Sequence, residues 1–232
     1  MLNRFLRRLR SSRQLVTLPS LVAYEQWAGQ YPPHAHNALM EAEEKAMRAL
    51  FPQLGGKTVL DLACGSGRYG LIASSEGASI SIGLDNSLPM LRQNSMSLKA
   101  LSSTEMIPLA SHSIDVVLCG LALGHLKQLA PSMLEISRVL KGGGSALVSD
   151  FHPFIFLNGQ QRTFTTADGH AYAVEHYVHL YSDYHQAAHQ AGMTIEAVME
   201  PRLGQTTEVR FADATTQMGT PIIIVYRFVK EG

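Results

Sequence analysis

The chain has 232 residues, of which 46% are hydrophobic and 16% charged, with 19 basic and 19 acidic side chains. This size and composition predict one domain with a sizeable core, and the zero net charge argues against a general affinity for nucleic acid or anionic membranes. Cys64 and Cys119 follow apolar runs and do not suggest a disulfide framework, so a reducing, cytoplasmic setting is expected. No apolar run reaches the roughly 18 residues of a membrane-spanning helix.

The first sixteen residues differ from the rest, because arginines alternate with apolar residues at helical spacing. A functional interpretation is docking on an acidic partner, RNA or a membrane surface. The favoured alternative is a frayed or surface-packed helix. The segment lacks the apolar region and cleavage site of a secretory signal, and a transit peptide is left open. Its basic residues are Arg4, Arg7, Arg8, Arg10 and Arg13.

Aromatic residues recur next, at Tyr24, Trp27 and Tyr31, before Pro32-Pro33 ends the helical pattern. These side chains either pack in the core or form a lid over a cofactor. An amphipathic helix is predicted over residues 36–50, with Glu41, Glu43 and Glu44 toward its start, where they favour the helix dipole.

Alternating strand and helix patterns follow. Their order predicts a mostly parallel sheet covered by helices on both faces. The glycines after Lys141 are expected to end the fourth helix, and Asp183 to cap the last one. The predicted elements are strand 58–62, helix 68–76, strand 79–85, helix 87–97, strand 98–101, strand 114–123, helix 128–140, strand 145–150, an irregular stretch 151–175, an exposed strand 176–182, helix 183–192, and strands 194–200 and 221–229.

The stretch TVLDLACGSGRYG, residues 58–70, joins the first of these strands to its helix through a small-residue loop. Glycine lets the backbone adopt a positive φ and approach a ligand closely. Gly65 and Gly67 fit a G-x-G-x-x-G dinucleotide pattern, with Asp85 eighteen residues later as a ribose-binding acid. Asp61 favours a different ligand, because its carboxylate can accept a hydrogen bond from an ammonium group such as that of S-adenosylmethionine.

VLDLACGSG resembles the first motif of the class I S-adenosylmethionine-dependent methyltransferases. The resemblance continues through GLDNSLPML, STEMIPLASHSIDVVLCGLALGHL and SRVLKGGGSALVSDFHP, about residues 57–153, and is nearest to the branch with small-molecule methyltransferases and the malonyl carrier-protein methyltransferase. It implies an α/β, Rossmann-like fold with a seven-stranded, mostly parallel sheet in the order 3-2-1-4-5-7-6 and an antiparallel strand 7. The expected organisation is a basic helix and aromatic lid in residues 1–35 and a methyltransferase domain in residues 36–232, with an acceptor-pocket insertion at 151–182.

The resemblance also assigns cofactor contacts. The methionine part would meet the first motif, Asp85 would bind both ribose hydroxyls, a later loop would lie at the adenine edge, and the end of strand four would face the sulfonium. The sequence departs from the family at Ser103-Thr104, where Asp-Ala is frequent, and at Gly142, where proline is common. The implied residues are Asp61, Ala63, Cys64, Gly65, Gly67, Asp85, Asn86, Met90, Ser103, Thr104, Glu105, Cys119, Gly120 and Leu121.

The acceptor side is less defined by the sequence. His152 and His125 follow strand ends and are candidate bases, although His152 could equally be a structural histidine that orders the Phe-Pro turn. A carboxylate acceptor needs no base, whereas a hydroxyl or amine benefits from one. Candidate substrate contacts are Tyr24, Trp27, Tyr31, His152 and Tyr177. His185 and His189 are spaced as a ligand pair, but no third ligand accompanies them, so no metal is expected.

These features predict methyl transfer from S-adenosylmethionine to a small-molecule or carrier-bound acceptor, with a carboxylate or hydroxyl oxygen favoured over nitrogen or carbon. The alternatives are a nucleic-acid methyltransferase, which the N-terminal arginines suggest and the zero net charge disfavours, and a non-catalytic cofactor-binding protein. A dehydrogenase is the weakest interpretation. The sequence leaves the oligomeric state open, with a homodimer among the options.

Overall fold

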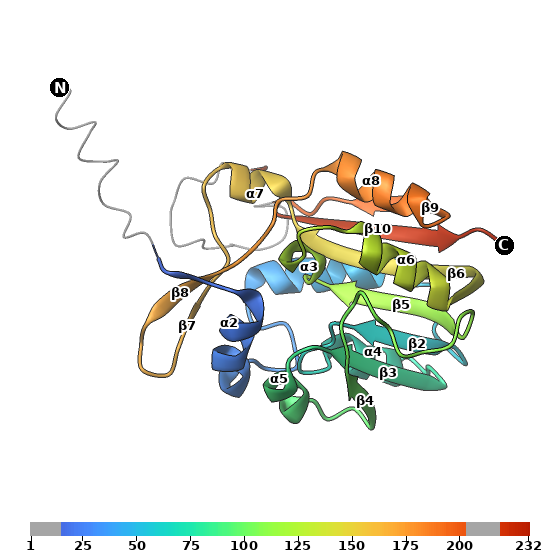
Figure 1. Cartoon of the computed structure of the whole chain (residues 1–232), viewed down its shortest axis with the longest axis horizontal. Coiled ribbons are helices and arrows are strands. Elements are labelled where there is room, and N and C mark those ends of the chain that lie inside the picture. The colour runs from blue at the N-terminus through green and yellow to red at the C-terminus, as the bar shows by residue number, and fades with distance from the viewer. Residues whose placement is uncertain (1–14, 203–218) are drawn as a thin grey trace.

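A central sheet of seven strands organises the chain in the computed structural model, which describes residues 15–202 and 219–232 (Figure 1). The basic segment of residues 1–14 therefore lies outside the described residues. The strand order is β4-β3-β2-β5-β6-β10-β9, and β10 runs antiparallel to both of its neighbours. The strands are β2 Thr58–Leu62, β3 Ile80–Asp85, β4 Leu98–Leu101, β5 Ile114–Gly120, β6 Leu140–Phe151, β9 Met193–Met199 and β10 Ile223–Lys230.

Numbered along the chain, these strands have the order 3-2-1-4-5-7-6, so the expected fold class is confirmed. Helices cover both faces: α6 and α8 pack on one apolar cluster, and α3 and α4 on the other. The buried strands between these layers carry apolar side chains on both faces, as parallel strands in such sheets do. The helices are α2 Ser20–Trp27, α3 Ala38–Ala49, α4 Arg68–Ser75, α5 Leu88–Gln93, α6 Ala130–Val139, α7 Pro153–Leu157 and α8 Tyr181–Gln190, with 3-10 turns η1 Ala28–Gln30 and η2 Leu123–His125.

Local signals explain where several helices begin. The Asn37 side chain accepts a hydrogen bond from the Met40 amide at 2.9 Å and caps α3. Ser87 caps α5 in the same manner, and Pro89 occupies the first turn, where its missing N–H costs little. Within the described ranges, no helix has both the length and the apolar character that crossing a membrane requires.

Three expected boundaries are wrong, each because of a tertiary contact. Residues 176–180 form no strand: the Tyr177 amide donates to Gly124 O, and α8 begins after Leu180, so Asp183 lies inside its first turn instead of capping it. Helix α5 ends at Gln93 because the Asn94 side chain turns to donate to Gly65 O. The glycines after Lys141 lie inside β6, where the pairing with β5 shifts register.

A second, three-stranded sheet was not expected from the sequence. It joins β1 Thr17–Leu18 to the hairpin of β7 Thr163–Thr165 and β8 Ala171–Val174, in the order β1-β8-β7. Trp27 of α2 stacks on Phe164 with ring centroids 5.2 Å apart. Figure 1 shows this sheet and α2 together beside the end of the large sheet, so the segment before the main domain and the insertion after β6 form one structural unit.

Candidate active site

The glycine loop after β2 is built from residues in left-handed backbone conformations. Gly65 has φ of 51° and Gly67 of 95°, and a Cβ at Gly67 would lie 2.5 Å from Asn94 Oδ1. Ala63, with φ of 55°, and Leu121, with φ of 57°, adopt the same conformation without being glycine. Such strained non-glycine residues concentrate at functional sites, and here both lie at the ends of neighbouring strands and line one cavity.

Asp85, the last residue of β3, ties this loop to the next strand. One carboxylate oxygen accepts from the Gly65 amide at 2.8 Å, and the other accepts from the Ser87 amide at 2.7 Å. Burial raises the pKa of Asp85, while the amide hydrogen bonds oppose that shift. Each oxygen keeps a further lone pair, so Asp85 can also accept hydrogen bonds from a ligand hydroxyl.

Asp61, on β2, is 2% exposed and accepts a hydrogen bond from the Gly70 amide at 2.7 Å. Burial raises the pKa of this carboxyl to about 7, although the Gly70 amide and the charge of Arg68 act in the opposite direction. A buried carboxyl of this kind favours a cationic ligand group, because a nearby positive charge stabilises its ionised form.

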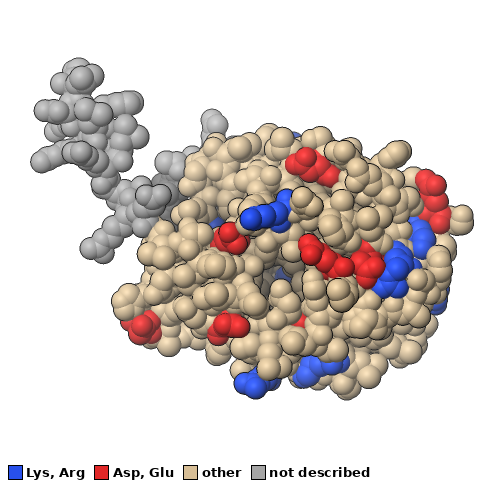
Figure 2. Space-filling model, viewed as in Figure 1, with Lys and Arg blue, Asp and Glu red and all other residues tan. Residues whose placement is uncertain are grey.

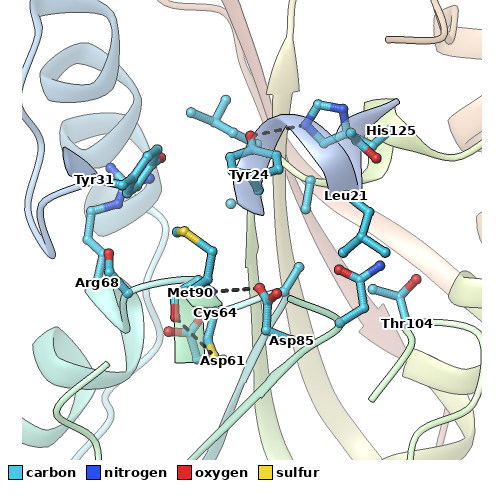
Figure 3. Close-up of a pocket in the computed structure, with 18 of the residues that line it drawn as sticks. Leu21, Tyr24, Tyr31, Asp61, Cys64, Arg68, Asp85, Met90, Thr104 and His125 are labelled. Carbon is cyan, nitrogen blue, oxygen red and sulfur yellow. Dashed lines mark hydrogen bonds between the residues drawn. The ribbon is translucent and has the colours of Figure 1, made fainter. Parts of the chain in front are cut away.

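The cavity lies at the carboxyl ends of β2, β3 and β5, where open α/β sheets bind their ligands (Figure 3). Most of the predicted site residues come together here. In Figure 3, Tyr24 and His125 lie on the side of the cavity opposite Asp61, Asp85 and Thr104. The predicted residues that line it are Tyr24, Tyr31, Asp61, Ala63, Cys64, Gly65, Asp85, Asn86, Met90, Ser103, Thr104, Gly120, Leu121 and His125.

The lining fits S-adenosylmethionine. Asp61 offers an acceptor for an ammonium group, Asp85 offers one for ribose hydroxyls, and the loop between them is closely packed, since a Cβ at Gly65 would lie 3.0 Å from Met90 Cε. Gly120 is equally restricted, because a Cβ there would lie 2.4 Å from the Tyr69 ring. At the adenine edge Glu105 is exposed and outside the lining, whereas Ser103 and Thr104 belong to it.

The opposite side of the cavity is made by Tyr24, His125 and Arg162. His125 Nδ1 lies 2.8 Å from the Glu175 carbonyl, which can only accept, so Nδ1 carries the proton. Nε2 then accepts from Tyr24 Oη at 3.2 Å and from Arg162 Nη1 at 3.1 Å. Burial, reinforced by the Arg162 charge, lowers the pKa of His125 to about 3. His125 is therefore a neutral, weakly basic side chain that orients its two neighbours.

Six predicted site residues lie outside the cavity lining. Trp27 is in a second layer, stacked on Tyr24 at 5.9 Å, and Tyr177 donates its hydroxyl to Glu175. Cys119 is fully buried within β5, and both cysteines are free. The six are Trp27, Gly67, Glu105, Cys119, His152 and Tyr177.

His152 is fully buried after β6 and has partners on both ring nitrogens. Nε2 lies 2.7 Å from Tyr181 Oη and 3.0 Å from Glu200 Oε1, and Nδ1 accepts from the Phe154 amide at 3.3 Å. Burial lowers its pKa, and Glu200 opposes that shift. This geometry matches the structural alternative, in which His152 orders the turn into α7.

Sequence reasoning missed both arginines of the lining. Arg68 follows the glycine loop, so its position alone could have indicated it. It forms an ion pair with the buried Glu43 at 2.8 Å, and Glu43 also accepts from Tyr69 Oη at 2.7 Å. Arg162 lies in the irregular stretch after β6, where no pattern marks it.

The next question is whether a third metal ligand lies near the predicted pair of histidines. His185 and His189 both lie on α8, as expected. Among the described residues, no group of three or more His, Cys, Asp or Glu side chains is placed to hold a metal ion.

Comparison with known proteins shows which family the chain resembles. Residues 60–148 match the family model described as a methyltransferase domain. An uncharacterized chloroplastic methyltransferase of Arabidopsis thaliana is 34% identical over 131 residues, which cover 49% of this chain and 37% of that protein. A malonyl-[acyl-carrier protein] O-methyltransferase of Enterobacter lignolyticus is 32% identical over 122 residues, covering 50% and 48%. The chain thus spans about half or less of the length of these two curated relatives.

A solved structure supports the fold assignment. The S-adenosylmethionine-dependent methyltransferase of Mesorhizobium loti has a TM-score of 0.66 and 22% identity, over 82% of this chain and 98% of that one. At this identity the similarity concerns the fold. Residues 60–148 therefore resemble a methyltransferase domain, as the sequence motifs indicated, and the chain shares the fold of a solved S-adenosylmethionine-dependent methyltransferase.

Proposed function

We propose that this protein transfers a methyl group from S-adenosylmethionine to an oxygen atom, carboxylate or hydroxyl, of a small-molecule or carrier-bound acceptor. The observation that carries the proposal is the pair of buried carboxylates, Asp61 and Asp85, on neighbouring strand ends around a glycine loop with positive φ. The similarity to a malonyl-[acyl-carrier protein] O-methyltransferase supports an oxygen acceptor.

When bound, S-adenosylmethionine supplies a methyl group already activated on a sulfonium. The protein's own contribution is to position the methyl donor and the acceptor and to exclude water from the cavity. Asp61 would hold the ammonium group and Asp85 the ribose, and Gly120 and Leu121, which line the cavity at the end of β5, would lie near the reacting atoms. Tyr24, from α2, lies on the side of the cavity opposite Asp61 and Asp85, where it would help to exclude water.

The test is methyl transfer from a cofactor labelled in its methyl group, with the full chain and a cell extract that contains metabolites and acyl-carrier proteins. The proposal expects label in an acceptor and none after heat denaturation of the protein. Binding of S-adenosylhomocysteine without any transfer would support a non-catalytic cofactor-binding protein instead. Transfer to nucleic acid alone would overturn the acceptor class.

A further inference from the structure

Two arginines line the cavity, and their surroundings differ. Arg68 is neutralised, because Glu43 Oε2 lies 2.8 Å from its Nη2 and Glu44 Oε2 lies 3.7 Å from its Nη1. Arg162 is only 8% exposed, yet it forms no ion pair with any acid in the described part of the chain. A buried cation without an acid partner is costly. The rings of Tyr24 and Phe151, whose centroids lie 5.5 and 5.2 Å from Arg162 Cζ, offset part of that cost but supply no hydrogen-bond acceptor, so the position beside a cavity points to a ligand.

The hydrogen bonds of Arg162 leave one edge of its guanidinium group free. Nη1 donates to Leu121 O at 2.9 Å and to His125 Nε2 at 3.1 Å. Nε and Nη2 form no hydrogen bond with described residues, although a guanidinium group carries five N–H donors. The backbone fixes its position, since Arg162 O accepts from the Val174 amide of β8 at 2.8 Å.

The chemistry of this edge selects an anion of low charge. A planar guanidinium edge matches the two oxygens of a carboxylate. A phosphate dianion is disfavoured, because the other lining arginine is already paired and the carboxylates of Asp61 and Asp85 lie across the cavity. Burial raises the pKa of Asp150, the nearby acid, to about 6, and the charge of Arg162 is among the weaker effects that oppose this shift. Its oxygens already accept from Tyr184 Oη at 2.7 Å and from the Phe151 amide.

We propose that Arg162 binds a carboxylate of the methyl acceptor, so that the substrates are carboxylic acids, free or attached to a carrier. This inference rests on the proposed function and names its substrate class. His125 contributes by holding Nη1, and its neutral, weakly basic ring is suited to an acceptor that arrives already ionised. Arg162 is then a specificity-determining residue of the acceptor side.

The experiment divides a cell extract into portions and offers each to the full-length protein with methyl-labelled S-adenosylmethionine. One portion is amidated with carbodiimide and methylamine, which removes carboxylate charges, and its control receives methylamine alone. Another is treated with phosphatase. The inference expects the label to disappear after amidation and to persist in the control and after phosphatase. Label that survives amidation, or that is lost after phosphatase, would overturn it.

Variants of Arg162 test the assignment at the residue. Arg162→Gln is expected to raise the acceptor KM roughly 10- to 150-fold, as the loss of charge-assisted hydrogen bonds implies. The affinity for S-adenosylhomocysteine, measured by calorimetry, should stay within twofold of wild type. Arg162→Lys keeps the positive charge and serves as a second variant in case Arg162→Gln misfolds. Its acceptor KM should lie between the values of the wild type and Arg162→Gln. Arg48→Gln, which removes an exposed pair with Glu76, is the matched control.

The possible failures are distinguishable. A weakened affinity of both Arg162 variants for S-adenosylhomocysteine would assign the arginine to the cofactor and overturn the inference. An unchanged acceptor KM in both variants would also overturn the inference. If no portion of the extract is labelled and S-adenosylhomocysteine does not bind, the proposed function itself is wrong, and the inference falls with it.

Discussion

The two sides of the cavity are held together in different ways. The cofactor side is fixed by carboxylates that bind main-chain amides: Asp61 holds Gly70 and Asp85 holds Gly65 and Ser87. The acceptor side centres on a junction of side chains, with Tyr24 and Arg162 meeting on His125. Two main-chain carbonyls anchor this junction, those of Glu175 and Leu121. Main-chain amides are present whatever the neighbouring residue types are, whereas the junction on His125 requires Tyr24 and Arg162 themselves.

The charge distribution on the surface bears on how an acceptor would be recognised. Figure 2 shows a face hollowed near its centre, where charged side chains of both signs are scattered among uncharged ones. Such a distribution gives little long-range attraction for a polyanion. Recognition of the acceptor would then depend on contacts inside the cavity, of which Arg162 is the charged one without an acid partner among the described residues.

The largest effect is expected at the cofactor side. Asp85→Ala should weaken S-adenosylhomocysteine binding by more than tenfold, because a charge-assisted hydrogen bond contributes about 1.5–3 kcal/mol. Calorimetry measures it. Asp115→Ala is the matched control: Asp115 also caps a strand amide, that of Thr58 at 2.9 Å, but lies at the other end of the sheet. An unchanged affinity in Asp85→Ala would remove the ribose assignment.

Protonation of Asp61 gives the next effect. Its pKa of about 7 means that the free protein carries a proton there below pH 7, and a bound ammonium group would displace it. Affinity for S-adenosylhomocysteine should therefore fall by about tenfold per pH unit as pH decreases below 7. Calorimetry in buffers of different ionisation enthalpy should detect proton release. Equal affinity at pH 6 and pH 8 in the wild type would contradict the ammonium contact.

A smaller effect is expected from the second layer of the acceptor side. Trp27→Ala removes the stack on Phe164 that joins α2 to the β7–β8 hairpin. Aromatic pairs contribute about 0.5–1.5 kcal/mol, so the acceptor KM should rise roughly 2- to 10-fold while cofactor affinity is kept. Trp27→Phe should restore most of the loss. A fall in cofactor affinity without a change in KM would show that the two sides are not separate.

His152→Ala should have the smallest effect on catalysis. Its ring is outside the cavity, and its loss leaves the Phe154 amide without its acceptor and the Tyr181 hydroxyl with Glu200 as its remaining partner. The expected result is a lower melting temperature, with kcat per folded molecule close to wild type. If kcat instead falls more than tenfold in a fully folded variant, His152 takes part in the chemistry after all.

The same division decides what the sequence could predict. The mostly parallel sheet follows from local βα patterns, and the strand order from the family resemblance that the short motifs carry. The structure also brings Asp61, Asp85 and the glycine loop together as expected. Arg162 could not be found this way, because its place depends on the pairing of Thr17 and Leu18 with Ala173 and Val174, far apart in the chain.

Errors in the sequence interpretation have a common physical origin. Residues 176–182 alternate like a strand, but the hydrogen bonds from Tyr177 to Gly124 O and from His179 to Leu126 O attach the segment to the η2 turn. His152 follows the end of β6, and its side chain turns toward Tyr181 and Glu200, a direction that its place in the sequence does not reveal. Side-chain direction at a loop depends on tertiary partners that a pattern does not contain.

The most direct test of the account is a calorimetric titration of the purified protein with S-adenosylhomocysteine and, separately, with NAD. The two buried carboxylates and the glycine loop predict one binding site for S-adenosylhomocysteine, with affinity that Asp85→Ala lowers, and no heat with NAD. Binding of NAD at this site, with no response to S-adenosylhomocysteine, would contradict the assignment of the cavity.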